Sequence, residues 1–216
     1  MVFQIYNTLT GKKERFESLS KDKVKMFVCG PTVYDLMHLG HARTFIFYDI
    51  LARFIVSKGY GLDFVINITD LDDKVFTRAK AEKVEYKVIS EKYTEAFYND
   101  LRALGVRDII TFAKASDFVK ESIEQVVKLV EKGYAYPVAG MVFYDTSKHS
   151  DYGKLSHQSM VELKLRRLDI DPNKKMQSDF LLWRPSEKDE PVWSSPYGNG
   201  RPGWHIEDTA ISIKIL

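Results

Sequence analysis

The sequence contains a single cysteine, Cys29, among its 216 residues. One cysteine excludes an internal disulfide, and no apolar secretory segment follows Met1, so we expect a cytoplasmic protein. The apolar runs are far shorter than the roughly 20 residues that cross a bilayer. The formal net charge is only +2, so any nucleic-acid-binding surface must be local. With 44% hydrophobic and 29% charged residues, the composition is that of a globular protein that buries a core.

The first third of the chain has the pattern of an α/β fold with a parallel sheet. A short apolar strand is predicted over 24–28, and apolar spacing predicts a helix over 42–58 that ends at Gly59. The near-continuous apolar run 62–68 is typical of a strand buried in a parallel sheet. Strand, helix and strand within about 45 residues predict a βαβ unit.

The remainder of the chain is predicted in less detail. Helical sequence runs over 74–104, and a second helix is expected over 118–132, capped by Ser116-Asp117 and ended by Gly133. Residues 134–200 are rich in Pro, Trp, Lys and Asp and predict an insertion with small hairpins, including a strand over 141–144. The stretch 200–210 has the pattern of a loop entering a helix.

The turn after the first parallel strand carries candidate nucleotide-binding residues. His38 and His41 lie three apart, so on a helix they share one face, with Gly40 between them. Two imidazoles beside a bare backbone at a helix N-terminus suit a nucleotide and its phosphates. The alternative is a buried turn with incidental histidines, and Cys29 taken alone is better explained as a buried structural thiol.

A second polar stretch, Asn67–Lys74, follows the strand over 62–68. Acidic residues at the carboxyl end of a sheet strand can bind a metal, a ribose or a substrate amine. The alternative is a helix start rich in acidic residues, which complement the helix dipole.

Eight motifs in order carry a resemblance to a known family. They are Ile5–Thr10, Cys29–Asp35, His38–Arg43, Asn67–Lys74, Gly133–Tyr136, Asp151–Ser156, Asp179–Trp183 and Gly200–Glu207. Together they resemble the amino-terminal half of a cysteinyl-tRNA synthetase, a class I aminoacyl-tRNA synthetase. The resemblance implies a Rossmann-type (HUP-like) parallel sheet, incomplete at the carboxyl end, with an α+β connective insertion. The implied organisation is 1–133 for the first half of the catalytic domain, 134–199 for the insertion and 200–216 for the return.

The resemblance also implies a cysteine–tRNA ligase, which joins cysteine to ATP as cysteinyl adenylate and passes it to tRNA(Cys). The ATP-binding residues would be Gly30, Thr32, His38, Gly40 and His41, with the two histidines catalytic at the phosphates. Mg²⁺ would accompany ATP. Because charge develops at the α-phosphate, placed donors and Mg²⁺ should carry most of the acceleration.

In this family a zinc ion selects the substrate thiol, and the resemblance assigns Cys29 as one ligand. Zinc prefers sulfur to a hydroxyl, which a pocket relying on shape alone separates weakly from a thiol. Tyr34, Thr69 and Trp204 would line the cysteine pocket together with Cys29. Asp208 stands where the family has a second zinc cysteine. An aspartate oxygen can ligate zinc, but the site becomes less soft.

The sequence ends before the family's remaining zinc histidine and glutamate and before its second signature, a lysine loop. We therefore expect weak activity from this chain alone. Lys175–Ser178 superficially resembles that lysine loop, but we interpret the match as chance and the stretch as a solvated loop. Lys164–Arg167 and Lys174-Lys175 are candidate contacts to tRNA phosphates.

Two alternative functions remain open at this stage. One is a short paralogue that serves as a nucleotide-binding or regulatory module. The other is a synthetase-like ligase that joins cysteine to a small-molecule amine.

Overall fold

The computed structural model describes residues 3–106, 109–159, 162, 171–203 and 205–216. The chain divides into two compact units. The parallel unit comprises Ser18–Glu121 and Glu207–Leu216, and the antiparallel unit comprises Met1–Glu17 and Ser122–Ile206. These boundaries differ from 134 and 199 in the sequence analysis. The difference arises because the contacts of the first residues and of most of the helix before 134 group with the antiparallel strands.

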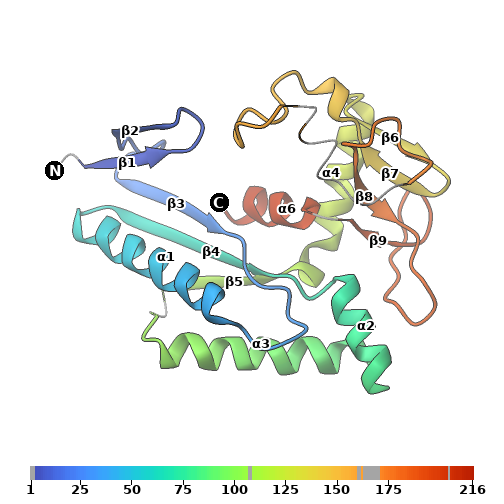
Figure 1. The fold of residues 1–216 in the computed structure, drawn as a ribbon, viewed down its shortest axis with the longest axis horizontal. Coiled ribbons are helices and arrows are strands. Elements are labelled where there is room, and N and C mark those ends of the chain that lie inside the picture. The colour runs from blue at the N-terminus through green and yellow to red at the C-terminus, as the bar shows by residue number, and fades with distance from the viewer. Residues whose placement is uncertain (1–2, 107–108, 160–161, 163–170, 204) are drawn as a thin grey trace. The chain divides into compact units, whose positions relative to one another are not determined.

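The parallel unit is built on a sheet of three parallel strands in the order β3-β4-β5 (Figure 1). The strands are β3 (Lys23–Val28), β4 (Gly61–Ile68) and β5 (Ile110–Lys114). The predicted βαβ unit is confirmed, with α1 (Leu39–Ser57) between β3 and β4. The strand β5 was not predicted, because its five residues lack the continuous apolar run of β4.

Side chains alternate between the two faces of the sheet, as the strand repeat requires. Phe64, Ile66 and Ile68 of β4 belong to the larger core, which includes residues of α1 and of the helices after β4. Val65 instead packs with Ile211 of α6 (Ile206–Ile215), and Figure 1 shows α6 on the sheet face opposite α1.

The helical stretch predicted as one over 74–104 is two helices, α2 (Asp73–Glu82) and α3 (Tyr86–Ala103). They separate at Lys83, whose φ of 56° is left-handed. No glycine or proline marks this break, so the sequence pattern did not reveal it. Asp72 caps α2 by accepting the backbone N–H of Lys74 at 2.8 Å. At this residue the helix-start interpretation of the acidic stretch is therefore confirmed.

The helix predicted over 118–132 is α4 (Val119–Glu131). It is preceded by a 3₁₀ turn, η1 (Ala115–Phe118), so Ser116-Asp117 lie inside that turn rather than at a simple cap. Gly133 follows α4 with a φ of +75°, in agreement with its expected role as a terminator.

The antiparallel unit holds the expected hairpins. Its four-stranded sheet has the order β6-β7-β8-β9, and a separate hairpin pairs β1 with β2. The strands are β1 (Gln4–Asn7), β2 (Lys12–Arg15), β6 (Ala135–Val138), β7 (Met141–Tyr144), β8 (Phe180–Arg184) and β9 (Arg201–Pro202). A 3₁₀ turn, η2 (Thr146–Lys148), follows β7. In the four-stranded sheet, the side chains of Val142, Phe143 and Trp183 are fully buried.

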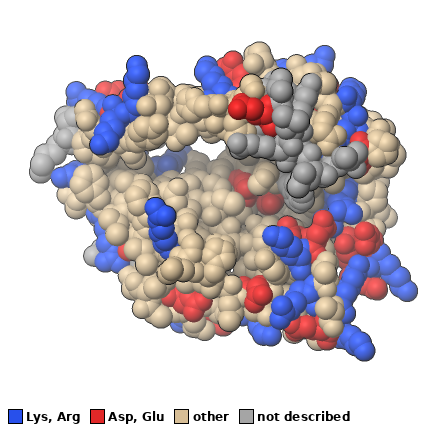
Figure 2. Space-filling view, in the orientation of Figure 1, with Lys and Arg blue, Asp and Glu red and all other residues tan. Residues whose placement is uncertain are grey.

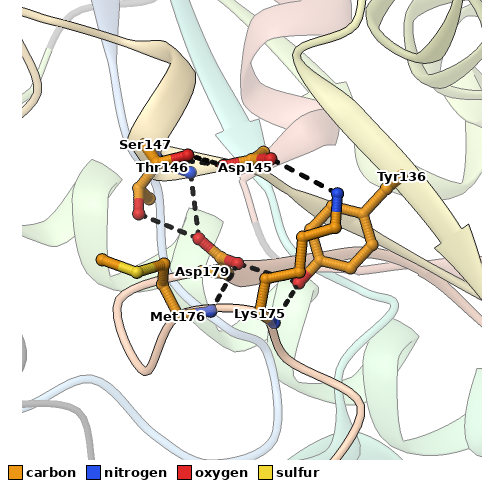
Figure 3. Close-up of polar contacts among 7 residues, drawn as sticks. All are labelled: Tyr136, Asp145, Thr146, Ser147, Lys175, Met176 and Asp179. Atoms are coloured by element: carbon orange, nitrogen blue, oxygen red, sulfur yellow. Dashed lines mark hydrogen bonds and ion pairs between the residues drawn. The ribbon is translucent and has the colours of Figure 1, made fainter.

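A buried carboxylate organises the loop before β8 (Figure 3). Asp179 has no exposed surface and accepts from the Tyr136 hydroxyl at 2.8 Å and from the backbone N–H of Thr146 at 2.9 Å and of Met176 at 3.0 Å. Ser178 is also buried. The interpretation of Lys175–Ser178 as a solvated loop is therefore wrong at Ser178, whereas the side chain of Lys175 is exposed.

Charges of both signs intermix on the surface around α2 (Figure 2), where Arg78 pairs with Asp35 and Glu82. This mixture agrees with the small net charge. Among the described residues, no helix combines the length and the apolar character needed to cross a membrane.

Candidate functional site

The turn after β3 runs beside the residues that follow β4. The backbone N–H of Val33 donates to Thr69 O at 3.2 Å, and that of Thr69 donates to Pro31 O at 3.1 Å. Gly30 lies so close to the neighbouring strand that a Cβ atom there would be 1.7 Å from Asn67 O. This close backbone approach alone requires glycine. Its assignment to ATP remains a prediction.

His38 and His41 form a reciprocal cap at the start of α1. The backbone N–H of Gly40 donates to His38 Nδ1 at 3.0 Å, and the backbone N–H of His38 donates to His41 Nδ1 at 3.3 Å. Since Nδ1 accepts in both rings, each ring carries its proton on Nε2. Both histidines can therefore donate from Nε2 beside a helix N-terminus, which suits an anionic ligand.

The two rings stack, with centroids 3.9 Å apart. Burial, and to a smaller extent the nearby His38, lower the pKa of His41. His41 is therefore neutral at physiological pH. Gly40 completes the arrangement, because a Cβ there would approach the His38 ring to 2.9 Å.

A pocket of about 330 Å³ opens beside these histidines. It is lined by Pro31, Thr32, Val33, Tyr34, Asp35, Leu36, Met37, His38, His41, Lys74, Tyr93 and Phe97. Four predicted site residues thus share one cavity: Thr32, Tyr34, His38 and His41. Lys74 adds a cation that the sequence analysis did not assign, with its Nζ 5.2 Å from the centroid of the Tyr34 ring.

Three further predicted residues lie at the carboxyl ends of the strands: Cys29 and Gly30 follow β3, and Thr69 follows β4. Cys29 Sγ lies 3.9 Å from Asp208 Oδ2, although 179 positions separate them in sequence. Asp208 comes from α6, on the sheet face that also receives the side chain of Asn67. Lost hydration around the sulfur and the negative charges of Asp208 and Glu207 raise the pKa of the Cys29 thiol to about 11.

The pair Cys29 and Asp208 fits two ligands of one zinc ion. A tetrahedral zinc with a Zn–S bond of about 2.3 Å and a Zn–O bond of about 2.1 Å places the donors roughly 3.6 Å apart. The observed 3.9 Å is close to that separation. Within the described part of the chain, no group of three or more His, Cys, Asp or Glu side chains is placed to hold a metal. The pair would supply only two of the four ligands that zinc takes in proteins, and its assignment to zinc remains a prediction.

Some of the predicted residues lie outside the part of the chain that the structure describes. Trp204 and Lys164–Arg167 are outside the described residues, so their assignments stay predictions.

Asn67, which was quoted above only as part of a motif, is fully buried and forms hydrogen bonds with both Gly30 and Asp208. A lone amide inside the apolar run of a buried strand was the available signal.

Comparison with solved structures bears on the fold of the chain. The chain is similar to the Mycobacterium tuberculosis methionyl-tRNA synthetase in complex with methionyl-adenylate, at 16% identity and a TM-score of 0.62. A second structure of that enzyme, bound by methionyl-adenylate, gives 14% identity and a TM-score of 0.61. Each match covers 88% of this chain but only 46% of the other, so the chain spans less than half of those proteins. These likenesses confirm the predicted α/β fold with its parallel sheet.

A family match covers nearly all of the chain. Residues 15–216 match the family described as the tRNA synthetases class I (C) catalytic domain. This range includes both histidines, Cys29 and Asp208. The chain therefore belongs to the family of class I (C) tRNA synthetase catalytic domains.

Proposed function

We propose that this chain is the amino-terminal catalytic part of a cysteine–tRNA ligase. Such an enzyme condenses cysteine with ATP to cysteinyl adenylate and pyrophosphate, and then transfers the cysteinyl group to tRNA(Cys). The observation that carries the proposal is the approach of Cys29 Sγ to Asp208 Oδ2, 3.9 Å apart, within a chain of the class I (C) family.

ATP would bind at the start of α1. The Nε2–H groups of His38 and His41 would donate to its phosphates, and Thr32 and Gly30 would contact it from the preceding turn. The backbone already holds both imidazoles through Nδ1, so little reorganisation is needed when charge develops at the α-phosphate. Mg²⁺ would accompany the phosphates as part of the nucleotide substrate.

Cysteine would be selected at the other end of the same turn. Zinc held by Cys29 and Asp208 would, when bound, supply a preference for a thiolate over a hydroxyl. Tyr34 and Thr69 would position the rest of the amino acid, and Trp204 would close the pocket. Tyr34 is half-buried in the pocket that also contains the histidines, which supports a continuous site for cysteine and ATP.

Contacts to tRNA are proposed for the antiparallel unit. Lys174-Lys175 and Lys164–Arg167 would meet phosphates of the acceptor end. Lys175 also lies 3.6 Å from Asp145, so any phosphate contact competes with that ion pair.

Amino-acid-dependent exchange of pyrophosphate into ATP tests the proposal, with cysteine, serine and methionine compared. Exchange driven by cysteine and not by the other two supports it, and exchange driven by methionine contradicts it. Exchange with cysteine followed by transfer to a small amine rather than to tRNA favours the alternative ligase. Binding of ATP and cysteine without exchange, in a longer protein that contains this chain, favours the regulatory module.

A further inference from the structure

Lys74 lines the cavity beside the histidines from the first turn of α2. Helix α2 lies beyond the carboxyl end of β4 (Figure 1), and Asp72 caps it by accepting the backbone N–H of Lys74. Val75 and Ala79 of the same helix belong to the larger core of the parallel unit. The backbone of Lys74 is therefore held in place both by the cap and by its buried neighbours.

The side chain of Lys74 lies against the turn after β3. Its Nζ is 5.2 Å from the centroid of the Tyr34 ring. Tyr34 packs against the same core and also lines the cavity. An ammonium group over an aromatic face is attracted by the quadrupole of the ring. This contact keeps the charge at the wall of the cavity without neutralising it, so a bound anion can still pair with Nζ.

The other polar groups of the cavity add little positive charge. Of the described residues that line it, only Lys74 and Asp35 carry a full charge when the two histidines are neutral. The helix cap uses Nδ1 of His38 and of His41 as acceptors, which requires neutral rings. Asp35 lies 3.7 Å from Arg78, which offsets its charge. Among these lining residues, Lys74 therefore supplies the positive charge.

Activation of an amino acid by ATP brings two anions together. A carboxylate oxygen of the amino acid forms a bond to the α-phosphorus, the bond from that phosphorus to the bridging oxygen breaks, and pyrophosphate leaves with the bonding electrons. Neutral histidines donate hydrogen bonds to phosphate oxygens but do not offset the repulsion, whereas an ammonium group does both. No proton moves to or from the lysine, which stays charged throughout.

We propose that the ammonium group of Lys74 binds the α-phosphate of ATP beside His38 and His41. The inference rests on the proposed ATP site at the start of α1 and adds a positively charged side chain to it. It also extends the contacts of ATP from the turn after β3 to a residue that follows β4.

A series of adenine ligands of increasing charge tests this role. Adenosine, AMP and ATP are titrated calorimetrically into the 216-residue chain, Lys74→Met and Lys74→Arg. We expect Lys74→Met to weaken the binding of AMP and of ATP at least about 10-fold, as for a lost hydrogen bond to a charged group. The affinity for adenosine should change less than about twofold, because adenosine has no phosphate for Nζ to contact. Lys74→Arg keeps the charge and should retain most of the affinity for AMP and ATP.

Lys80→Met is the matched control, because Lys80 is an exposed lysine of the same helix that does not line the cavity. It should bind all three ligands as the unmodified chain does. Lys74→Met should also keep the urea unfolding midpoint, because an exposed cation–π contact contributes little to stability. Were it to unfold, Lys74→Gln would take its place and must show the same dependence on the phosphate.

Full affinity of Lys74→Met for ATP would overturn the inference. Equal losses for adenosine and AMP would overturn it too, because Lys74 would then act only by supporting Tyr34. A loss with ATP but not with AMP would assign Lys74 to the outer phosphates and contradict its place at the α-phosphate. Failure of the unmodified chain to bind ATP would instead contradict the proposed ATP site itself, so the two failures are distinguishable.

Discussion

The imidazole rings of His38 and His41 stack face to face, with their planes inclined by 18°. Each ring accepts a backbone N–H through Nδ1, so the pair also serves as the N-terminal cap of α1. The same two side chains thus stabilise the helix and present Nε2–H groups for a phosphate. Stability and ligand binding can be separated at His38, because only the cap requires the Nδ1 atom.

We predict that His38→Asn preserves folding but weakens ATP binding. Asparagine is a good N-cap, so the free energy of unfolding should change by less than about 1 kcal/mol. The shorter amide cannot place a donor where Nε2 lies, so ATP affinity should fall at least about 10-fold, the equivalent of 1.4 kcal/mol. Urea unfolding and calorimetric titration with ATP measure the two effects. Full ATP affinity in a folded His38→Asn protein would remove this histidine from the site.

We predict that Gly30→Ala severely destabilises the parallel unit. Its Cβ would lie 1.7 Å from a backbone oxygen that cannot move without displacing β4. The expected cost is about 3 kcal/mol or more, as in overpacked cores. Gly61→Ala is the matched control, because its Cβ would meet nothing closer than 3.6 Å. Similar unfolding midpoints for the two variants would contradict this account.

The strand β4 and the helix α1 were predictable from sequence because their apolar patterns are long, and the short apolar strand β3 was predictable from its place before them in a βαβ pattern. The break between α2 and α3 was not, since Lys83 adopts a left-handed backbone without a glycine to signal it. Nor was β5, whose five residues include Thr111 and Lys114. Short strands depend on their neighbours in the sheet more than on their own sequence.

For the candidate site, sequence identified the residue types but not their connections. The proximity of Cys29 to Asp208 depends on α6 packing across the sheet, which no local pattern encodes. The hydrogen bond from Asn67 to Asp208 could not be predicted from the sequence for the same reason. At Lys175–Ser178 the local sequence was misleading. The stretch was expected to be a solvent-exposed loop, whereas hydrogen bonds to the buried Asp179 hold it in place.

Asp70 should make the stability of the parallel unit depend on pH. Burial raises its pKa above the ordinary 3.8, although hydrogen bonds from Ser116 oppose the shift. The folded state therefore holds this proton more tightly than the unfolded state. The contribution of Asp70 to stability is largest at acidic pH and declines as pH rises from 3.8 through the raised folded pKa.

Asp70→Asn removes this titration and should gain stability relative to the unmodified chain as pH increases across that window. Urea unfolding of both proteins at a series of pH values measures the difference. If Asp70→Asn instead loses stability relative to the unmodified chain with rising pH, the hydrogen bonds from Ser116 outweigh burial.

In the antiparallel unit, we predict that Asp179→Ala costs about 3 kcal/mol or more, because several buried donors lose their acceptor together. Tyr136→Phe removes only one of these donors and should cost about 1 kcal/mol. Amide hydrogen exchange at Thr146 and Met176 should accelerate strongly only in the Asp179 variant. Equal effects of the two substitutions would show that Asp179 is not the centre of this network.

The central claim is that the chain selects a thiol through Cys29 and Asp208. Its most direct test compares the binding of non-hydrolysable cysteinyl- and seryl-adenylate analogues to the zinc-supplemented chain and to Cys29→Ser. The account predicts that the cysteinyl analogue binds at least about 100-fold more tightly, the equivalent of 2.7 kcal/mol, and that Cys29→Ser largely abolishes the difference. Equal affinity for the two analogues, or a preference that survives in Cys29→Ser, would contradict it.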